Sequence, residues 1–172
     1  TTLVDGSHTI RVRASDSTGH MGYSPIVLVI VDNTGPVITD FRVIYPFGKV
    51  TALAGETVTV VAQVLDDMAG LIDGTVELDS TSLDGQTHVM LDDGVAPDRE
   101  AGARIYTAQL TITTRGNGAF AITITTTDRA GNVTTQTIDA WLRNTVTASG
   151  FCMIATATRA ETTTGIGYRL AS

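Results

Sequence analysis

The residues of this sequence with the clearest chemistry are short carboxylates. The chain has fourteen Asp against four Glu, and the shorter side chain suits turns and cation sites in loops. One predicted loop carries four carboxylates in nine positions, namely Asp92, Asp93, Asp98 and Glu100. Because Ca²⁺ takes six to eight oxygen ligands, these four side chains are candidate calcium ligands. The alternative, that each closes a turn by accepting from nearby backbone N–H groups, is equally open.

Further carboxylates stand at other predicted turns and linkers. Asp66 and Asp67 end a strand pattern, Asp32 lies in a predicted linker, and Asp16 and Asp128 hold equivalent positions in two similar turns. For Asp16 and Asp128 the turn-closing role is favoured. Asp32 and Asp128 are nevertheless kept among the candidate calcium ligands. The sequence therefore predicts no required cofactor, and calcium as the one ion that could stiffen the chain.

Nothing in the sequence predicts a catalytic site. The three histidines, His8, His20 and His88, fall in separate strands or turns, and neither a G-x-S-x-G nor an H-E-x-x-H pattern occurs. A single cysteine, Cys152, excludes an intramolecular disulfide and a cysteine-based metal site. We therefore expect that the chain is not an enzyme.

Charge and hydropathy exclude two further classes of protein. The formal net charge is −7, and no segment clusters Lys or Arg with aromatic residues, so nucleic-acid binding is not expected. The longest apolar run, residues 26–31, is far shorter than the roughly 20 residues of a membrane-spanning helix. The chain begins with Thr1 and carries no signal-like segment, so we expect a processed or truncated part of a longer protein.

The elements that position these residues are predicted to be strands. Thr, Val and Ile make up about a third of the chain, and branched residues favour strands over helices. Seven segments bounded by Gly, Asp, Asn or Pro read as strands, at residues 37–45, 57–65, 75–78, 88–91, 106–112, 119–126 and 133–142. Seven strands suit a β-sandwich. Alternation places three sets of side chains inward, namely Val58, Val60, Ala62 and Val64; Tyr106, Ala108, Leu110 and Ile112; and Phe120, Ile122 and Ile124. Trp141 is expected in the core or as an end cap.

An internal repeat organises the chain. Residues 5–20 read DGSHTIRVRASDSTGH and residues 117–132 read NGAFAITITTTDRAGN, one pattern at an offset of 112. A repeat this long, built of short strands, indicates tandem domains. We predict the last two or three strands of an incomplete domain over residues 1–35, a complete sandwich over residues 36–145, and a tail over residues 146–172.

These motifs resemble those of bacterial immunoglobulin-like repeats of large secreted and surface proteins. In that family a D-x-A-G-N turn joins the last two strands and a D-x-T-x-P linker leads to the next domain. Here the turn is residues 128–132 and the linker is residues 32–36. The loop at residues 91–102 resembles an Asp-rich loop of related extracellular domains, with Ala103-Arg104 standing where the family usually has an acidic residue. The resemblance implies tandem immunoglobulin-like sandwiches at a bacterial cell surface or outside the cell.

The tail carries a second resemblance and a prediction about assembly. Residues 152–157, Cys-Met-Ile-Ala-Thr-Ala, are close to the C-F-I-A-T-A segment near the C-termini of many bacterial surface proteins. The tail strand, which includes Phe151, Cys152, Met153, Ile154 and Ala155, is apolar on both faces and is expected to be buried. It either packs on its own domain or adds to the incomplete sandwich of a neighbouring chain, which would build a head-to-tail filament. The first four strands of the incomplete domain come either from upstream residues or from another chain.

The leading functional hypothesis is a non-catalytic extracellular structural or adhesive protein that acts as a surface spacer or filament subunit. Its expected partners are other copies of itself or other surface proteins. The alternative is a carbohydrate-binding or spacer module of a larger secreted enzyme, which exposed aromatic residues would favour.

Overall fold

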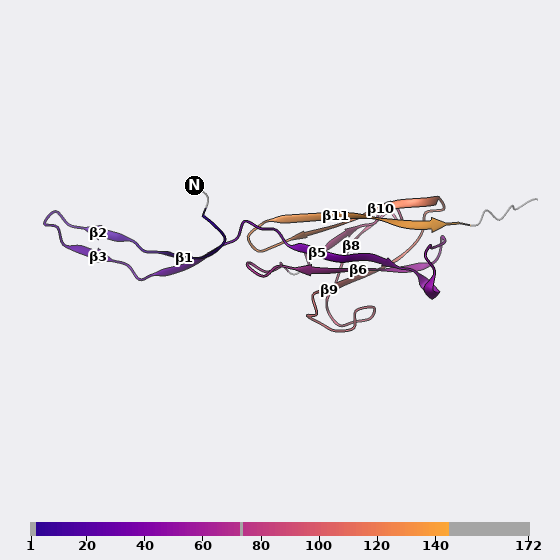
Figure 1. Ribbon diagram of the computed structural model, residues 1–172, viewed down its shortest axis with the longest axis horizontal. Helices are drawn as coiled ribbons and strands as arrows, with labels where there is room; N and C mark the ends of the chain where they lie inside the picture. Colours follow the sequence, from indigo (N-terminus) through magenta and orange to yellow (C-terminus); the bar gives the residue numbers. More distant parts are fainter. Residues whose placement is uncertain (1–2, 73, 145–172) are drawn as a thin grey trace, which may run out of the picture.

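The computed structural model describes residues 3–72 and 74–144, which form a long hairpin followed by a two-layer β-sandwich (Figure 1). Apart from one short 3-10 turn, η1 (Pro46–Gly48), the regular elements of these residues are strands. The predicted all-β sandwich class is thereby confirmed. No helix in the described ranges has the length and hydropathy to cross a membrane.

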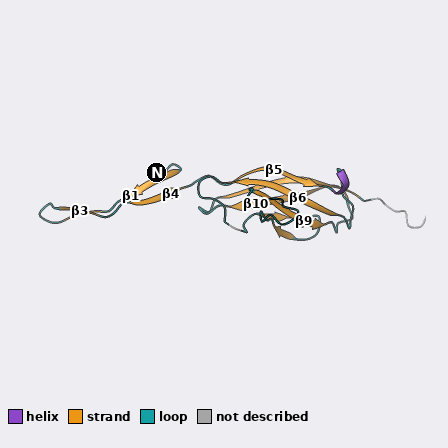
Figure 2. Ribbon diagram, turned by 90° about the horizontal axis from the view of Figure 1, so that it is seen from below, coloured by secondary structure: helices purple, strands orange, loops and turns teal. Residues whose placement is uncertain are grey.

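The hairpin extends away from one end of the sandwich (Figure 2). Its two antiparallel ladders pair β1 (Gly6–Ile10) with β4 (Val27–Val31) and β2 (Arg13–Ser15) with β3 (Met21–Tyr23). Two residues separate the ladders on the first arm and three, including Pro25, on the second. Because proline has no N–H to donate, the extra residue and Pro25 interrupt the ladder at this point.

The sandwich has a three-stranded and a four-stranded sheet. The first sheet has the order β5–β6–β9, and its strands are β5 (Val37–Ile44), β6 (Thr57–Leu65) and β9 (Ile105–Thr111). The second has the order β11–β10–β7–β8, and its strands are β7 (Glu77–Asp79), β8 (Thr87–Val89), β10 (Asn117–Thr127) and β11 (Val133–Arg143). Each of the seven predicted strands overlaps one of these.

The core lies between the two sheets and follows the predicted alternation. Nine of the eleven predicted inward side chains are buried, and Tyr106 and Phe120 are half-buried against the same cluster. The prediction for Trp141 is wrong, because Ala140 and Leu142 take the inward positions of β11 and leave Trp141 on the outer face, 52% exposed. A strand's period of two decides this placement and outweighs the preference of a lone tryptophan for burial.

The sequence repeat recurs as a repeat of backbone pairing. In the hairpin Ile10 faces Val27, and at the equivalent place in the sandwich Ile122 faces Ile138. The two turns also match. The N–H of Asp16 donates to the carbonyl of His20, just as the N–H of Asp128 donates to the carbonyl of Asn132. The hairpin is therefore a second copy of the β10–β11 ribbon.

Candidate metal centre at the linker

Residues 32–36 connect the hairpin to β5 and are held from both sides. On the hairpin side, Asp5 accepts from the N–H of Asn33 at 2.8 Å and from the hydroxyl of Thr34 at 2.6 Å. Those bonds, the Thr34 hydroxyl first, hold the pKa of Asp5 below its usual value. On the sandwich side, the Asn132 side chain donates to the carbonyl of Asp32 at 3.2 Å. The linker is thus fixed to both parts it connects.

Gly35 lets the linker lie directly against Thr134, near the start of β11. A Cβ at this position would stand 2.6 Å from the hydroxyl oxygen of Thr134, closer than side chains approach. Only glycine therefore fits there without moving the linker or Thr134.

Three carboxylates from distant parts of the sequence meet at this junction. Asp32 comes from the linker, Asp66 follows the last residue of β6, and Asp128 follows the last residue of β10. One oxygen from each lies within 4.8 Å of the others. Asp128 is fully buried, whereas Asp32 and Asp66 are half-buried. The packing of the two sheets brings the ends of β6 and β10 together with the linker.

The present partners of these carboxylates are neutral N–H groups. Asp32 accepts from the N–H of Ala69 at 2.9 Å, and Asp66 accepts from the N–H of Gly70 at 2.7 Å. Asp128 accepts from both the N–H and the side-chain amide of Asn132, each at 2.8 Å. None of the ion pairs among the described residues involves the three. The three carboxylates thus lie close together without an ion pair to a cationic side chain among the described residues.

The electrostatics of Asp128 favour the ionised form. Burial raises the pKa of its carboxyl, but the hydrogen bonds from the side chain and backbone of Asn132, with those from Ala130 and Gly131, outweigh burial and leave the pKa below its usual value. An ionised carboxylate is the state that binds a hard cation. The sequence singled out Asp32 and Asp128 as candidate ligands but did not join Asp66 to them.

The Asp-rich loop has a different arrangement. Asp92 accepts from the N–H groups of Ala103 and Arg104 at 3.1 and 2.8 Å, which closes the base of the loop. Asp93 accepts from the N–H of Val95, and Asp98 accepts from the N–H groups of Gly94 and Glu100. The bond from Gly94 is the main reason that the pKa of Asp98 lies below its usual value.

In these contacts Asp92, Asp93 and Asp98 accept from nearby backbone N–H groups, which is one of the two roles that the sequence left open for the loop carboxylates. Within the described ranges, Asp92, Asp93, Asp98 and Glu100 do not form a group of three converging ligands. Convergence among described residues occurs at Asp32, Asp66 and Asp128 instead. The predicted assembly residues 151–155 lie outside the described residues.

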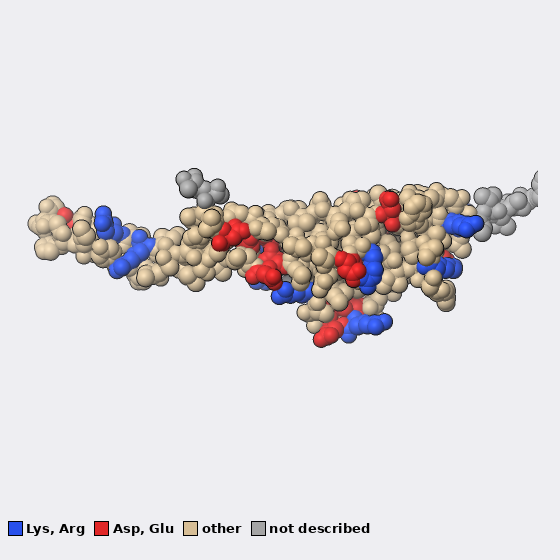
Figure 3. Space-filling view, viewed as in Figure 1, with Lys and Arg blue, Asp and Glu red and all other residues tan. Residues whose placement is uncertain are grey.

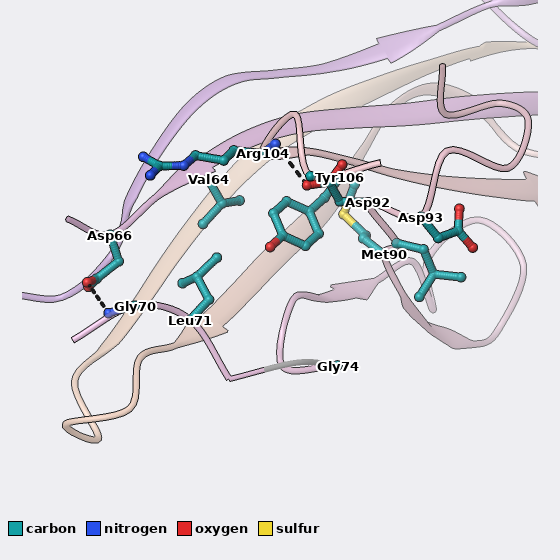
Figure 4. Close-up of a pocket in the computed structure, with 12 residues that line it drawn as sticks. Val64, Asp66, Gly70, Leu71, Gly74, Met90, Asp92, Asp93, Arg104 and Tyr106 are labelled. Carbon is teal, nitrogen blue, oxygen red and sulfur yellow. Dashed lines mark hydrogen bonds between the residues drawn. The ribbon is translucent and has the colours of Figure 1, made fainter. Parts of the chain in front are cut away.

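A hollow of about 500 Å³ opens beside Asp66 (Figure 4). Its apolar lining includes Val64, Leu71, Met90 and Tyr106. Its acidic lining consists of Asp66, Asp92 and Asp93, each of which already accepts from a backbone N–H. The hollow therefore combines an apolar lining with three carboxylates and with Arg104, whose guanidinium donates to Asp67 at 3.0 Å.

The surface shows no extended basic area on the face drawn in Figure 3. Lys and Arg occur there in small groups, most of them beside Asp or Glu. In the hairpin, the Arg11 guanidinium lies 4.1 Å from the centre of the Tyr23 ring, a cation–π contact.

No protein-family model matches this sequence, and no curated protein matches it either. Among solved structures it is similar to the fibronectin(III)-like modules of CbhA from Clostridium thermocellum, with 19% sequence identity and a TM-score of 0.40. The match covers 83% of this chain and 65% of that one, so this chain spans less than two thirds of the other's length. The fold class stated above rests on this chain's own two sheets.

Proposed function

We propose that this chain is a non-catalytic extracellular spacer, a β-sandwich module that holds its neighbours apart in a row of domains. One observation carries the proposal: the described chain enters and leaves the sandwich at opposite ends. The linker lies against Asn132 and Thr134, where β11 begins. The last residues of β11 lie beside residues 52–54, where Ala52 pairs with Leu142. An 11-residue strand separates these ends by about 35 Å.

The histidine contacts support a role without catalysis. His8 bonds the carbonyl of Val4 and His20 bonds Asp16, both on the exposed hairpin. His88 lies 2.6 Å from Asp84, which also accepts from the hydroxyl of buried Ser80. Here the carboxylate stands between the hydroxyl and the imidazole. In a hydrolase triad the imidazole takes the middle place and removes the serine proton, so this order does not activate Ser80.

Calcium at Asp32, Asp66 and Asp128 would make the spacer stiff. The three carboxylates join the linker to both sheets, and a divalent cation among them would offset their repulsion. Binding to the folded state alone raises the melting temperature by mass action. We expect Ca²⁺ to raise the melting temperature and a chelator to reverse the rise. Asp66→Asn should remove the response, whereas Asp93→Asn, in the Asp-rich loop, should keep it.

Spin labels test the spacer itself. Labels at Ser17→Cys in the hairpin turn and Arg115→Cys at the far end of the sandwich, with Cys152→Ser, report the length of the module. A single narrow distance distribution, narrower still with Ca²⁺, is expected. A broad distance distribution that does not change when Ca²⁺ is added would mean that the linker is flexible and that the proposal is wrong.

A spacer of this kind serves equally in a cell-surface protein and in a larger secreted enzyme, the alternative drawn from the sequence. One observation favours carbohydrate binding within that alternative: Trp141 is half exposed and Phe47, in η1, is 96% exposed. Aromatic faces open to solvent are suited to stacking on sugar rings. Affinity electrophoresis in gels containing soluble polysaccharides tests it. Retardation that is lost in Trp141→Ala and kept in Tyr23→Ala would support binding, and no retardation of the parent chain would reject it for those polysaccharides.

The head-to-tail filament stays a prediction, because it depends on residues 151–155. Deleting residues 148–172 should abolish multimers if the tail is the assembly strand. Multimers that persist after the deletion would exclude it.

A further inference from the structure

The hairpin carries an apolar face for which the described residues provide no cover. The repeat identifies this face, because Ile10, Val12 and Ala14 are equivalent to Ile122, Ile124 and Thr126. The last three are completely buried between the sheets. In contrast, Val12 is 65% exposed, and Ile10 and Ala14 are exposed as well.

The second arm of the hairpin shows the same equivalence, with Val27 exposed and with Val29 and Val31 half-buried. Val27, Val29 and Val31 take the positions of Ile138, Ala140 and Leu142, which face the core of the sandwich. In the sandwich, the sheet β5–β6–β9 covers that face, and the core cluster joins both sheets. No described strand covers the hairpin in the same way.

An open strand edge lies beside the bare face. In the sandwich, residues 123–125 of β10 pair with residues 77–79 of β7. The equivalent hairpin residues are Arg11, Val12 and Arg13, and no third strand pairs with them among the described residues. The hairpin therefore has both contacts of a sandwich ribbon available, its face and its edge.

We infer that this face and edge are the docking surface for the other five strands of a second β-sandwich, supplied by polypeptide that precedes the hairpin in the intact protein. These strands would correspond to β5–β9: a three-stranded sheet with an inner face of small and branched apolar residues, and a strand like β7 at the edge. The interface between these strands and the hairpin would have a counterpart within this chain, between β10–β11 and the strands that contact them.

The order of the repeat favours a covalently preceding partner. Within the complete sandwich, β5–β9 come directly before β10, with only residues 112–116 between β9 and β10. A unit read in the same order places the missing strands just before Asp5. A single strand from the tail of another copy could add to the edge at residues 11–13, but one strand is too narrow to cover a face that three strands cover in the sandwich. The inference rests on the proposed row of domains and names the partner on the hairpin side.

A graft of the chain's own strands tests the inference. Residues 36–116 are placed directly before Asp5 of the full chain, so that the hairpin takes the position of β10–β11 in a new sandwich. Hydrogen exchange of residues 8–12 and 27–31 should slow by at least about 100-fold, because amides of a covered core strand exchange only through larger openings. Without the graft, the same amides should exchange quickly at every protein concentration.

Two variants show which face is used. Val12→Asp in the grafted chain should return the exchange to its ungrafted rate, because the equivalent Ile124 is fully buried. Leu28→Asp is the matched control. Leu28 is as exposed as Val12, but it lies on the outer face, at the position where the sandwich carries Asp139. It should leave the protection intact.

A third chain keeps the test decisive if the graft does not fold. In it the inward hairpin positions carry the sandwich residues, through His8→Phe, Val12→Ile, Ala14→Thr, Val27→Ile, Val29→Ala and Val31→Leu. If this chain protects the hairpin and the native hairpin stays unprotected, the inference is overturned. Hairpin protection in the ungrafted chain that grows with protein concentration would overturn it too, because the face would then bind a second copy. The spin-label distances within the ungrafted chain test the spacer separately.

Discussion

The hairpin β1–β4 and the ribbon β10–β11 share one turn and, on either side of the extra residue in the second arm of the hairpin, equivalent strand pairs, but they differ in burial. Both turns place an Asp carboxylate as the acceptor of the N–H four residues later, at 2.9 Å for Asp16 and 2.8 Å for Asp128. Asp16 is exposed, whereas Asp128 is completely buried. The turn and the strand pairing next to it are thus local properties that persist without a covering sheet, because the turn residues fix the pairing of the strands that follow.

The same two regions differ in the chemistry that they can support. The turn at Asp128 lies against the linker and the end of β6, which adds Asp32 and Asp66 to it. The turn at Asp16 lies at the free tip of the hairpin and bonds only its own residues, Thr18 and His20. An equivalent turn becomes a candidate cation site where other elements bring further oxygens to it.

The largest difference is expected for core truncation. Ile124→Ala removes a fully buried side chain and should lower the free energy of unfolding by about 2–5 kcal/mol. Val12→Ala at the equivalent hairpin position removes an exposed side chain and should change it by less than about 0.5 kcal/mol. Urea unfolding of the two variants measures both values. Equal losses would mean that the hairpin face is already covered in solution.

A smaller difference is expected for the turn carboxylates. Asp128→Ala leaves the N–H of Asn132 without its acceptor in a buried setting, which should cost about 1–3 kcal/mol. Asp16→Ala exposes the equivalent N–H to water, which can replace the acceptor, so its effect should be clearly smaller. Calorimetry gives the two melting temperatures, and Asp128→Asn, which keeps one oxygen acceptor, should recover part of the loss. A loss for Asp16→Ala as large as that for Asp128→Ala would contradict this account.

Acid should open the hairpin turn in a defined range. The Thr18 hydroxyl, followed by the backbone and ring of His20, lowers the pKa of Asp16 from 3.8 to about 2. A carboxyl with a lowered pKa contributes stability that is complete above its unfolded value and is lost as the pH falls through its folded value. The amide signal of His20 should therefore shift with a midpoint near pH 2. A midpoint near 4 would show that the carboxylate is not held in the turn.

Only a small effect on stability is expected at the linker. Gly35→Ala places a methyl group against the hydroxyl of Thr134 and should move the linker while changing the free energy of unfolding by less than about 1 kcal/mol. The distance distribution between labels at residues 17 and 115 should shift or broaden. Thr134→Ala combined with Gly35→Ala removes the hydroxyl and should restore the original distance distribution. An unchanged distance distribution in Gly35→Ala would show that the close approach of Gly35 to Thr134 does not set the direction of the hairpin relative to the sandwich.

The strands, the repeat and the inward faces can be predicted from local sequence patterns, because each depends on residues close together in the chain. Alternation of apolar and polar residues is enough to place Val58 and Ile122 in the core. The same alternation places Ala140 and Leu142 on the inner face of β11 and therefore Trp141 on its outer face.

Which carboxylates converge depends on the packing of the two sheets. The density of carboxylates at residues 92–100 predicts a cation site in that loop, where Asp92 instead accepts from backbone N–H groups. The three carboxylates that converge, Asp32, Asp66 and Asp128, are far apart in sequence. They meet because the ends of β6 and β10 come together when two sheets pack face to face, and the linker leaves the sandwich at that end. Sheet packing depends on residues far apart in the chain, so no local pattern encodes it. It also explains why the β10–β11 ribbon is buried while the equivalent hairpin is exposed.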